Sequence, residues 1–149
     1  MSKRWIGRLL SLCLLVVCVG CGRQMVTDQP KSPMKFYYKT VDASYGEGQG
    51  ATGYEIREVY GHESDDVWIL TEYLQGPVSQ ELVAPFQRSI SVVSAERVGT
   101  QLRLCVSREL ANLSGADLTV ACACITWTCL EFSGVESVSI CAVGSQLGG

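Results

Sequence analysis

The sequence predicts an α+β domain, in which a mixed β-sheet carries two helices on one face, after a signal peptide and a tether. Short runs rich in aromatic and β-branched residues predict strands, two longer runs have helical periodicity, and the two kinds of run alternate. The predicted order is strand, possible hairpin, helix, strand, strand, helix, strand. A chain of 149 residues, 47% hydrophobic and 18% charged, is sufficient for one domain with a core, which argues against general disorder.

The first 20 residues have the pattern of a secretory signal. A basic start is followed by an apolar run from Leu9 to Val19. This run is shorter than the roughly 20 residues that a membrane-spanning helix needs. It ends in Val19-Gly20-Cys21, which resembles a bacterial lipoprotein signal, so we expect a signal peptide over residues 1–20 and lipid on Cys21. An ordinary signal peptide with incidental cysteines is the alternative.

The residues that follow are predicted to form a tether over 21–34, because they contain two of the four prolines and no apolar periodicity. The domain would then occupy residues 35–149. The formal charge is −3, but residues 1–20 hold three of the 12 basic residues and none of the 15 acidic ones, so the remainder is near −6. A net-acidic surface argues against nucleic acid as a partner.

The domain begins with a predicted strand over residues 35–41, which are aromatic and β-branched. Residues 42–53 are rich in glycine and predict a loop, and they lack the lysine and Ser/Thr of a phosphate-binding loop. Residues 54–60 alternate in polarity and predict a short, partly exposed strand.

The first predicted helix is the best-marked element. The segment Ser64–Asp66 supplies an N-cap and acidic residues for the first turn. Val67, Leu70 and Leu74 recur at helical spacing, and Gly76–Pro77 is typical of a helix end. After it, residues 89–98 and 101–107 are predicted to form a hairpin around a two-residue turn.

The second helix is predicted over residues 118–132, capped by Asp117, and a last strand over residues 135–143. The helix has no charged residue from Leu118 to Leu130, and a helix that is apolar all round is buried on more than one side. One face is expected to lie on the sheet: Leu118, Cys122, Ile125, Cys129 and Phe132. A second stripe, Val120, Cys124 and Trp127, is the predicted partner-binding surface. Cover by the first helix or by the glycine-rich loop is the alternative.

The eight cysteines divide into two groups. Three lie in the signal region, and five lie in apolar stretches, where buried thiols are the main expectation: Cys105, Cys122, Cys124, Cys129 and Cys141. If residues 101–107 and 137–143 are strands, Cys105 and Cys141 lie on the same type of face, and a disulfide requires their Cα atoms to be within about 7 Å. A thiol oxidoreductase that uses Cys122 or Cys124 would lack the usual Cys-x-x-Cys spacing.

The residues do not predict an enzyme. The chain has one histidine, His62, and no motif for a catalytic triad, a carboxylate pair or a metal site. We therefore expect no catalytic residue, no metal and no cofactor.

The stretch from Tyr73 to Ile140 resembles the GerMN domain of sporulation and spore germination lipoproteins. The match rests on Tyr73–Pro77, Ile90–Val93, Gln101–Val106, the apolar second helix and Gly134–Ile140. Two features depart from the family pattern. Trp127–Leu130 replaces Asn-Thr-Leu-Thr, and one domain fits where two occur in tandem. The resemblance implies a βαββαβ-like domain, related in shape to ring-building motifs, that serves in assembly or adhesion.

The expected function is that of a non-catalytic lipoprotein at the extracytoplasmic face of a bacterial membrane. It would bind another envelope protein or itself during sporulation or germination. The alternative is an envelope lipoprotein that binds a small ligand or peptidoglycan through an aromatic-rich region: Phe36, Tyr37, Tyr38, Tyr45, Tyr54 and Tyr60.

Overall fold

The computed structural model describes residues 31–42 and 50–143. The predicted signal peptide, the lipidation site Cys21 and most of the tether lie outside these ranges, as does Tyr45. The elements, in order, are β1 (Pro33–Thr40), β2 (Thr52–Glu58), α2 (Asp66–Leu74), β3 (Leu82–Val83), β4 (Val92–Val98), β5 (Gln101–Val106), the 3₁₀ helix η1 (Arg108–Asn112), α3 (Gly115–Leu130) and β6 (Ser137–Ala142). Neither α2 nor α3 combines the length and the apolarity needed to cross a membrane.

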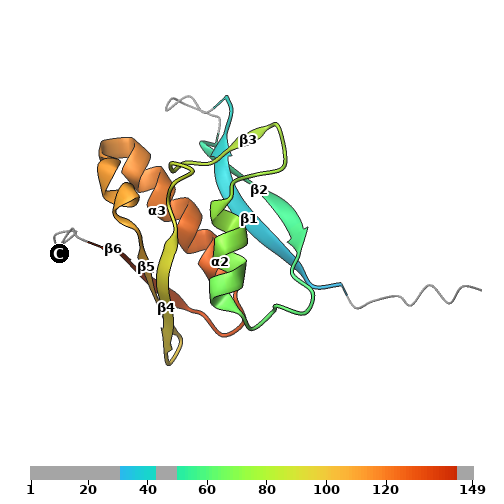
Figure 1. Ribbon diagram of the computed structural model, residues 1–149. Helices are drawn as coiled ribbons and strands as arrows, with labels where there is room; N and C mark the ends of the chain where they lie inside the picture. Colours follow the sequence, from blue (N-terminus) through green and yellow to red (C-terminus); the bar gives the residue numbers. More distant parts are fainter. Residues whose placement is uncertain (1–30, 43–49, 144–149) are drawn as a thin grey trace, which may run out of the picture.

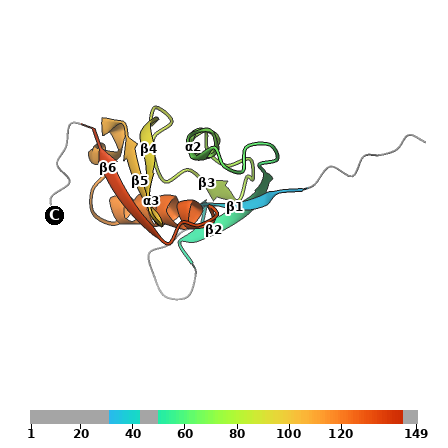
Figure 2. The ribbon, with the colours of Figure 1, turned by 90° about the horizontal axis from the view of Figure 1, so that it is seen from below.

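The strands form two three-stranded sheets (Figure 1). In the first, with the order β2-β1-β3, both pairs are antiparallel. In the second, with the order β4-β5-β6, β4 is antiparallel and β6 parallel to β5. The predicted α+β class is confirmed, but the strands do not form one sheet with both helices on one face. Figure 2 shows α2 and α3 on opposite sides of the molecule, between the two sheets.

Strand β1 explains why there are two sheets. One of its edges pairs with β2 over seven residues, and its other edge pairs with β3 only at Lys39 and Thr40. Helix α3 packs against β1, which leaves no room for β5 or β6 to extend this sheet. Strand β1 begins at Pro33, two residues before the predicted start, and buries Met34, Phe36 and Tyr38 on one face.

Helix α2 confirms the predicted caps. The Asp65 carboxylate accepts a hydrogen bond from the Trp68 N–H at 2.9 Å, and Gly76 has a φ of +96°, which favours glycine just after a helix. The buried face differs from the expectation at Val67, which is 47% exposed. Leu70 and Leu74 are buried as predicted, together with Ile69 and Tyr73.

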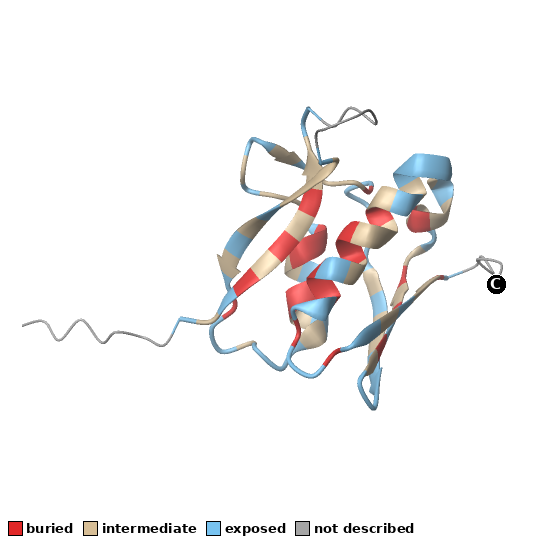
Figure 3. Cartoon of the chain, turned by 180° about the vertical axis from the view of Figure 1, so that it is seen from behind, coloured by how far each residue is buried: buried red, intermediate tan, exposed pale blue. Residues whose placement is uncertain are grey.

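Helix α3 begins at Gly115, three residues before the predicted start, and is N-capped by Ser114 rather than by Asp117. It is buried on more than one side, as its apolar sequence predicts, because it contacts both β1 and β6 (Figure 3). Its fully buried residues are Ala121, Cys124, Ile125, Thr128 and Cys129. Of the predicted inner face, Ile125 and Cys129 are buried, while Leu118 and Cys122 are half-buried.

The second sheet contains the predicted hairpin, β4 and β5, joined at Gly99 and Thr100. Cys105 on β5 lies directly opposite Cys141 on β6, and the two form a disulfide with a Cα–Cα distance of 4.6 Å. The disulfide that the two strand faces allowed is therefore confirmed. The expectation of buried thiols is correct for Cys124 and Cys129 and wrong for the two bonded cysteines.

Candidate interaction surface

The predicted stripe on α3 is not one surface. Cys124 is fully buried and faces the core, so the expectation that it contacts a partner is wrong. The physical reason is that this side of α3 faces the core, where Cys124 lies close enough to Tyr73 of α2 to raise the pKa of that tyrosine. Val120 is half-buried, and Trp127 is 43% exposed. Of the three residues, Trp127 is the one that offers a large exposed side chain.

Thr128 joins α3 to the edge of β1. Its side chain is fully buried, and its Oγ1 accepts a hydrogen bond from the Tyr37 N–H at 3.0 Å. The Tyr73 hydroxyl, from α2, donates to the Tyr37 carbonyl at 2.9 Å, and the Tyr38 hydroxyl donates to the Tyr73 carbonyl at 2.9 Å. Burial raises the pKa of both tyrosines, which keeps the hydroxyls protonated as donors. The backbone N–H and carbonyl of Tyr37, which point away from β2, are thus satisfied by side chains from both helices.

Arg57 and Glu55 attach β2 to the end of α2. The Arg57 Nε donates to Glu55 at 2.7 Å, and its two Nη atoms donate to the carbonyls of Glu72 at 3.2 Å and Gly76 at 2.5 Å. A cation near the C-terminus of a helix is stabilised by the helix dipole. The sequence predicted a partly exposed strand here, whereas both side chains are largely covered, with 19% of Arg57 and 12% of Glu55 exposed.

Glu55 also holds the turn that follows α2. Its carboxylate accepts hydrogen bonds from the N–H groups of Val78 and Ser79. Burial by itself raises the pKa of Glu55, but these two N–H groups and Arg57 outweigh it, so the pKa lies below its ordinary value. The ionised form is therefore the one that the fold favours.

An aromatic face lies where β1, β2 and α3 meet, and we define it as Tyr37, Tyr54, Ile56 and Trp127. The ring of Tyr37 is 5.5 Å from that of Tyr54 and 5.8 Å from that of Trp127, measured between centroids. Tyr54 is 52% and Ile56 62% exposed. Tyr54, Ile56 and Trp127 expose large apolar surfaces around the half-buried Tyr37, so the four side chains form a candidate site for binding another molecule.

Charged groups border the aromatic face. The Lys35 ammonium lies 5.3 Å from the centre of the Tyr54 ring and 3.9 Å from the Glu131 carboxylate. The Tyr37 hydroxyl donates to the same carboxylate at 3.1 Å. Glu131 is the C-cap of α3, where the helix dipole disfavours a carboxylate, and these two contacts offset that effect. Burial and the contact with Glu131 raise the pKa of Tyr37.

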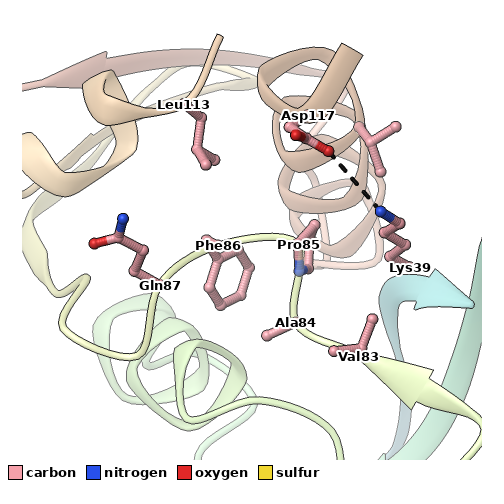
Figure 4. Close-up of a pocket in the computed structure, with 9 residues that line it drawn as sticks. Lys39, Val83, Ala84, Pro85, Phe86, Gln87, Leu113 and Asp117 are labelled. Atoms are coloured by element: carbon pink, nitrogen blue, oxygen red, sulfur yellow. Dashed lines mark ion pairs between the residues drawn. The ribbon is translucent and has the colours of Figure 1, made fainter. Parts of the chain in front are cut away.

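A pocket of about 270 Å³ lies between α3 and the segment that joins β3 to β4 (Figure 4). Pro85, Phe86 and Leu113 form apolar parts of its wall, and Val120 also lines it. The ion pair between Lys39 and Asp117, at 3.9 Å, lies at one side. These side chains do not include a nucleophile next to a base, so the pocket has no arrangement typical of covalent or acid–base catalysis.

His62 and the free cysteines Cys122 and Cys124 are the remaining candidates for chemistry. His62 stacks on Trp68, with ring centroids 3.9 Å apart. Burial raises the pKa of Cys122 and raises that of Cys124 to about 12, which is opposite to the shift that a nucleophilic thiol needs. Over the described ranges, no group of three or more His, Cys, Asp or Glu could hold a metal ion.

The aromatic residues that were predicted to bind a ligand do not form one surface. Phe36 and Tyr38 are in the core, at 1% and 0% exposed, while Tyr37 and Tyr54 belong to the aromatic face. Tyr60 is 47% exposed and lies outside that face. Trp127, from α3, completes the face. From the sequence, it was predicted to belong to the partner-binding stripe of the second helix instead.

Comparisons with known proteins connect this fold to solved structures. No protein-family model and no curated protein matches the sequence. The tandem GerMN domains of the sporulation protein GerM from Bacillus subtilis are 20% identical, with a TM-score of 0.58, over 85% of this chain and 43% of that one. A candidate lipoprotein from Clostridium perfringens is 16% identical, with a TM-score of 0.48, over 77% of this chain and 76% of that one.

The chain spans less than half the length of the solved GerM structure. At 20% identity, the likeness concerns the fold alone. It agrees with the resemblance between the sequence motifs and the GerMN pattern, which covers the first helix end, the hairpin, the second helix and the closing strand. The domain has a GerMN-type fold.

Proposed function

We propose that the chain is a non-catalytic, membrane-anchored lipoprotein whose single GerMN-type domain acts in protein assembly during sporulation or spore germination. The observation that carries this proposal is the GerMN-type fold, which it has in common with a sporulation protein. The aromatic face supports a binding role, because Tyr54, Ile56 and Trp127 expose apolar surface that a partner protein would cover.

The anchor in this proposal is lipid on Cys21. Each buried methylene group of an acyl chain contributes about 0.8 kcal/mol, so two or more chains hold a protein stably at a membrane. The residues between Cys21 and β1 would then place the domain on the order of 20 Å from the membrane, at its extracytoplasmic face.

The experiment is a deletion of the gene in the organism that encodes the chain. The strain is complemented with the wild-type chain or with Cys21→Ala, and sporulation and germination frequencies are compared with the membrane fraction of the protein. We expect a defect that the wild type corrects, whereas Cys21→Ala corrects it less and leaves the membrane fraction. Normal sporulation and germination in the deletion strain would contradict the assembly function.

Peptidoglycan binding is a second candidate, favoured by the ring contacts that join Tyr37 to Tyr54 and to Trp127. Aromatic faces of this kind stack on sugars. Sedimentation with purified peptidoglycan tests it. If glycan is the ligand, Trp127→Ala abolishes co-sedimentation, while Tyr60→Ala, which removes an equally exposed aromatic ring elsewhere, leaves it unchanged.

A further inference from the structure

The outer edge of β2 is the least protected strand edge of the first sheet. Over residues 31–42 and 50–143, no strand pairs with it. The register between β1 and β2 continues without a shift from Thr52 to Glu58, so this edge is regular along its full length. A regular, unpaired edge presents backbone donors and acceptors to another strand. Figure 2 shows β2 at the rim of the molecule.

The direction of these backbone groups follows from the bonds of Tyr37. Its N–H and its carbonyl bond to Thr128 and Tyr73, so both point away from β2. Tyr37 lies opposite Tyr54, which makes this a non-hydrogen-bonded pair of the antiparallel ladder. The N–H and carbonyl groups of Tyr54 therefore point outward. The same holds two residues further on for Ile56.

Exposed apolar side chains lie on both sides of this edge. On the outer face are Tyr54 and Ile56, at 52% and 62% exposed. On the inner side is Val78, which is 82% exposed although its N–H is bonded to Glu55 of β2. At the edge of β2, apolar side chains are exposed to water on both faces of the sheet, next to unpaired backbone groups. An added strand would pair with these backbone groups and cover the apolar side chains.

The edges of the second sheet differ from that of β2. Strand β4 has a register shift between Val92 and Ser94, and such a bulge interrupts pairing. Strand β4 also contacts α2, and its Arg97 is bonded to Asp66 at 2.6 Å. On β6, the exposed side chains at Ser137 and Ser139 are small and polar. Among these outer strands, β2 combines a regular register with large exposed apolar side chains on both sides of its edge.

We infer that two copies of this chain pair through β2, antiparallel and related by a two-fold axis near Glu55. In this register Tyr54 of each copy lies opposite Ile56 of the other, and Thr52 lies opposite Glu58. The outward backbone groups of all four residues then form hydrogen-bonded pairs. An aromatic residue opposite a β-branched one is a favourable cross-strand pair. This inference rests on the proposed assembly function and names the partner as a second copy.

The register pairs Tyr54 with Ile56 in both directions, which is why we assign the edge to a second copy. It also sets Glu55 opposite Glu55 at the axis, where each carboxylate stays bonded to Arg57, Val78 and Ser79 of its own copy. A shift of the axis to Ile56 would place Tyr54 opposite Glu58 and lose both aromatic–aliphatic pairs. With the axis at Glu55, the Val78 side chains of the two copies also lie on the same side of the joint sheet, close to the axis. Apolar surface is then covered on both faces.

The test uses two differently tagged full-length copies, produced together and extracted from membranes with detergent. The amount of one tag that co-purifies with the other measures self-association. Tyr54→Lys with Ile56→Lys places lysine opposite lysine, and we expect at least about a tenfold loss. Tyr54→Lys with Ile56→Glu places lysine opposite glutamate and restores co-purification. Val93→Lys with Val98→Lys, on exposed positions of β4, is the matched control and leaves it unchanged.

The outcomes separate this inference from the function on which it rests. The inference is overturned if wild-type copies do not co-purify, or if the two double variants at positions 54 and 56 behave alike. If the deletion strain still has its sporulation or germination defect, either result leaves the assembly function standing, with another protein as the partner. Thermal unfolding of each variant shows whether the domain itself is retained.

Discussion

The two sheets are attached to the rest of the domain in different ways. Around β1 and β2, side chains make directional bonds to both helices, through Thr128, Tyr73 and Arg57. In the second sheet, the central strand β5 buries the aliphatic side chains of Leu102, Leu104 and Val106, and the disulfide joins it to β6. Directional bonds fix β1 relative to α3, and so fix the aromatic face. Packing and the disulfide hold β5 and β6, and the ion pair between Arg97 and Asp66 is the directional contact that joins β4 to α2.

Removal of the disulfide, which holds the second sheet, should cause the largest loss of stability. Cys105→Ala with Cys141→Ala should lower the free energy of unfolding by about 2 to 4 kcal/mol, because the bond closes a loop between residues 36 apart. Urea unfolding of the oxidised wild type and the variant measures this. Reduction of the wild type should reproduce the loss. A change of less than about 0.5 kcal/mol would show that packing alone holds β6.

Arg57 tests the polar attachment of the first sheet. Arg57→Met keeps much of the aliphatic length but removes the bonds to Glu72 and Gly76 and leaves the Glu55 carboxylate without its cation. We expect a loss of about 2 kcal/mol in urea unfolding. Arg103→Met, at an exposed position of β5, is the control and should change stability by less than about 0.5 kcal/mol. Equal effects of the two would show that Arg57 holds nothing in place.

Thr128 should have a smaller effect on the same sheet. Thr128→Val is nearly isosteric and leaves the Tyr37 N–H without its acceptor, at a cost of about 1 to 2 kcal/mol. Amide hydrogen exchange should become faster at Tyr37 in particular. Thr119→Val, at an exposed position of the same helix, should leave the exchange of Tyr37 unchanged. Unchanged exchange in Thr128→Val would mean that α3 covers β1 by packing alone.

Acid should destabilise the first sheet by protonating Glu55. This is the smallest of the four expected losses of stability. The folded pKa of Glu55 lies below its ordinary value of 4.5, so the folded state binds this proton less readily than the unfolded state. Its contribution to stability is full above that ordinary value and is lost as the pH falls through the folded pKa. The difference in stability between the wild type and Glu55→Gln should therefore shrink from pH 7 to pH 3. A constant difference would contradict this assignment.

Local patterns predicted the elements well. Asp65 and Gly76 define α2 through its caps, and the turn at Gly99 defines the hairpin. These features depend on residues close in sequence. The division into two sheets depends on β3, a strand of two residues, and on α3 occupying an edge of β1, and neither leaves a periodic pattern in the sequence.

The candidate site was predicted less well, because it depends on distant pairs. Arg57 and Glu55 alternate with Ile56 as in a half-exposed strand, yet the charged residues are covered and Ile56 is exposed, since the end of α2 supplies their partners. On α3, the sequence offered one signal for this contact: Thr128 is polar, yet a helical wheel places it beside Cys124. Its partner is 91 residues away in sequence.

The position of α3 along β1 has a consequence for stoichiometry. A sheet with two open edges can add strands indefinitely, which leads to fibres. Here Thr128 and the two-residue strand β3 occupy the second edge of β1, so over the described residues β2 supplies the one long unpaired edge of the first sheet. A two-fold contact through β2 uses that side in both copies and leaves none for a third. The hydroxyl of one buried threonine would thus help to limit growth of this sheet to a pair.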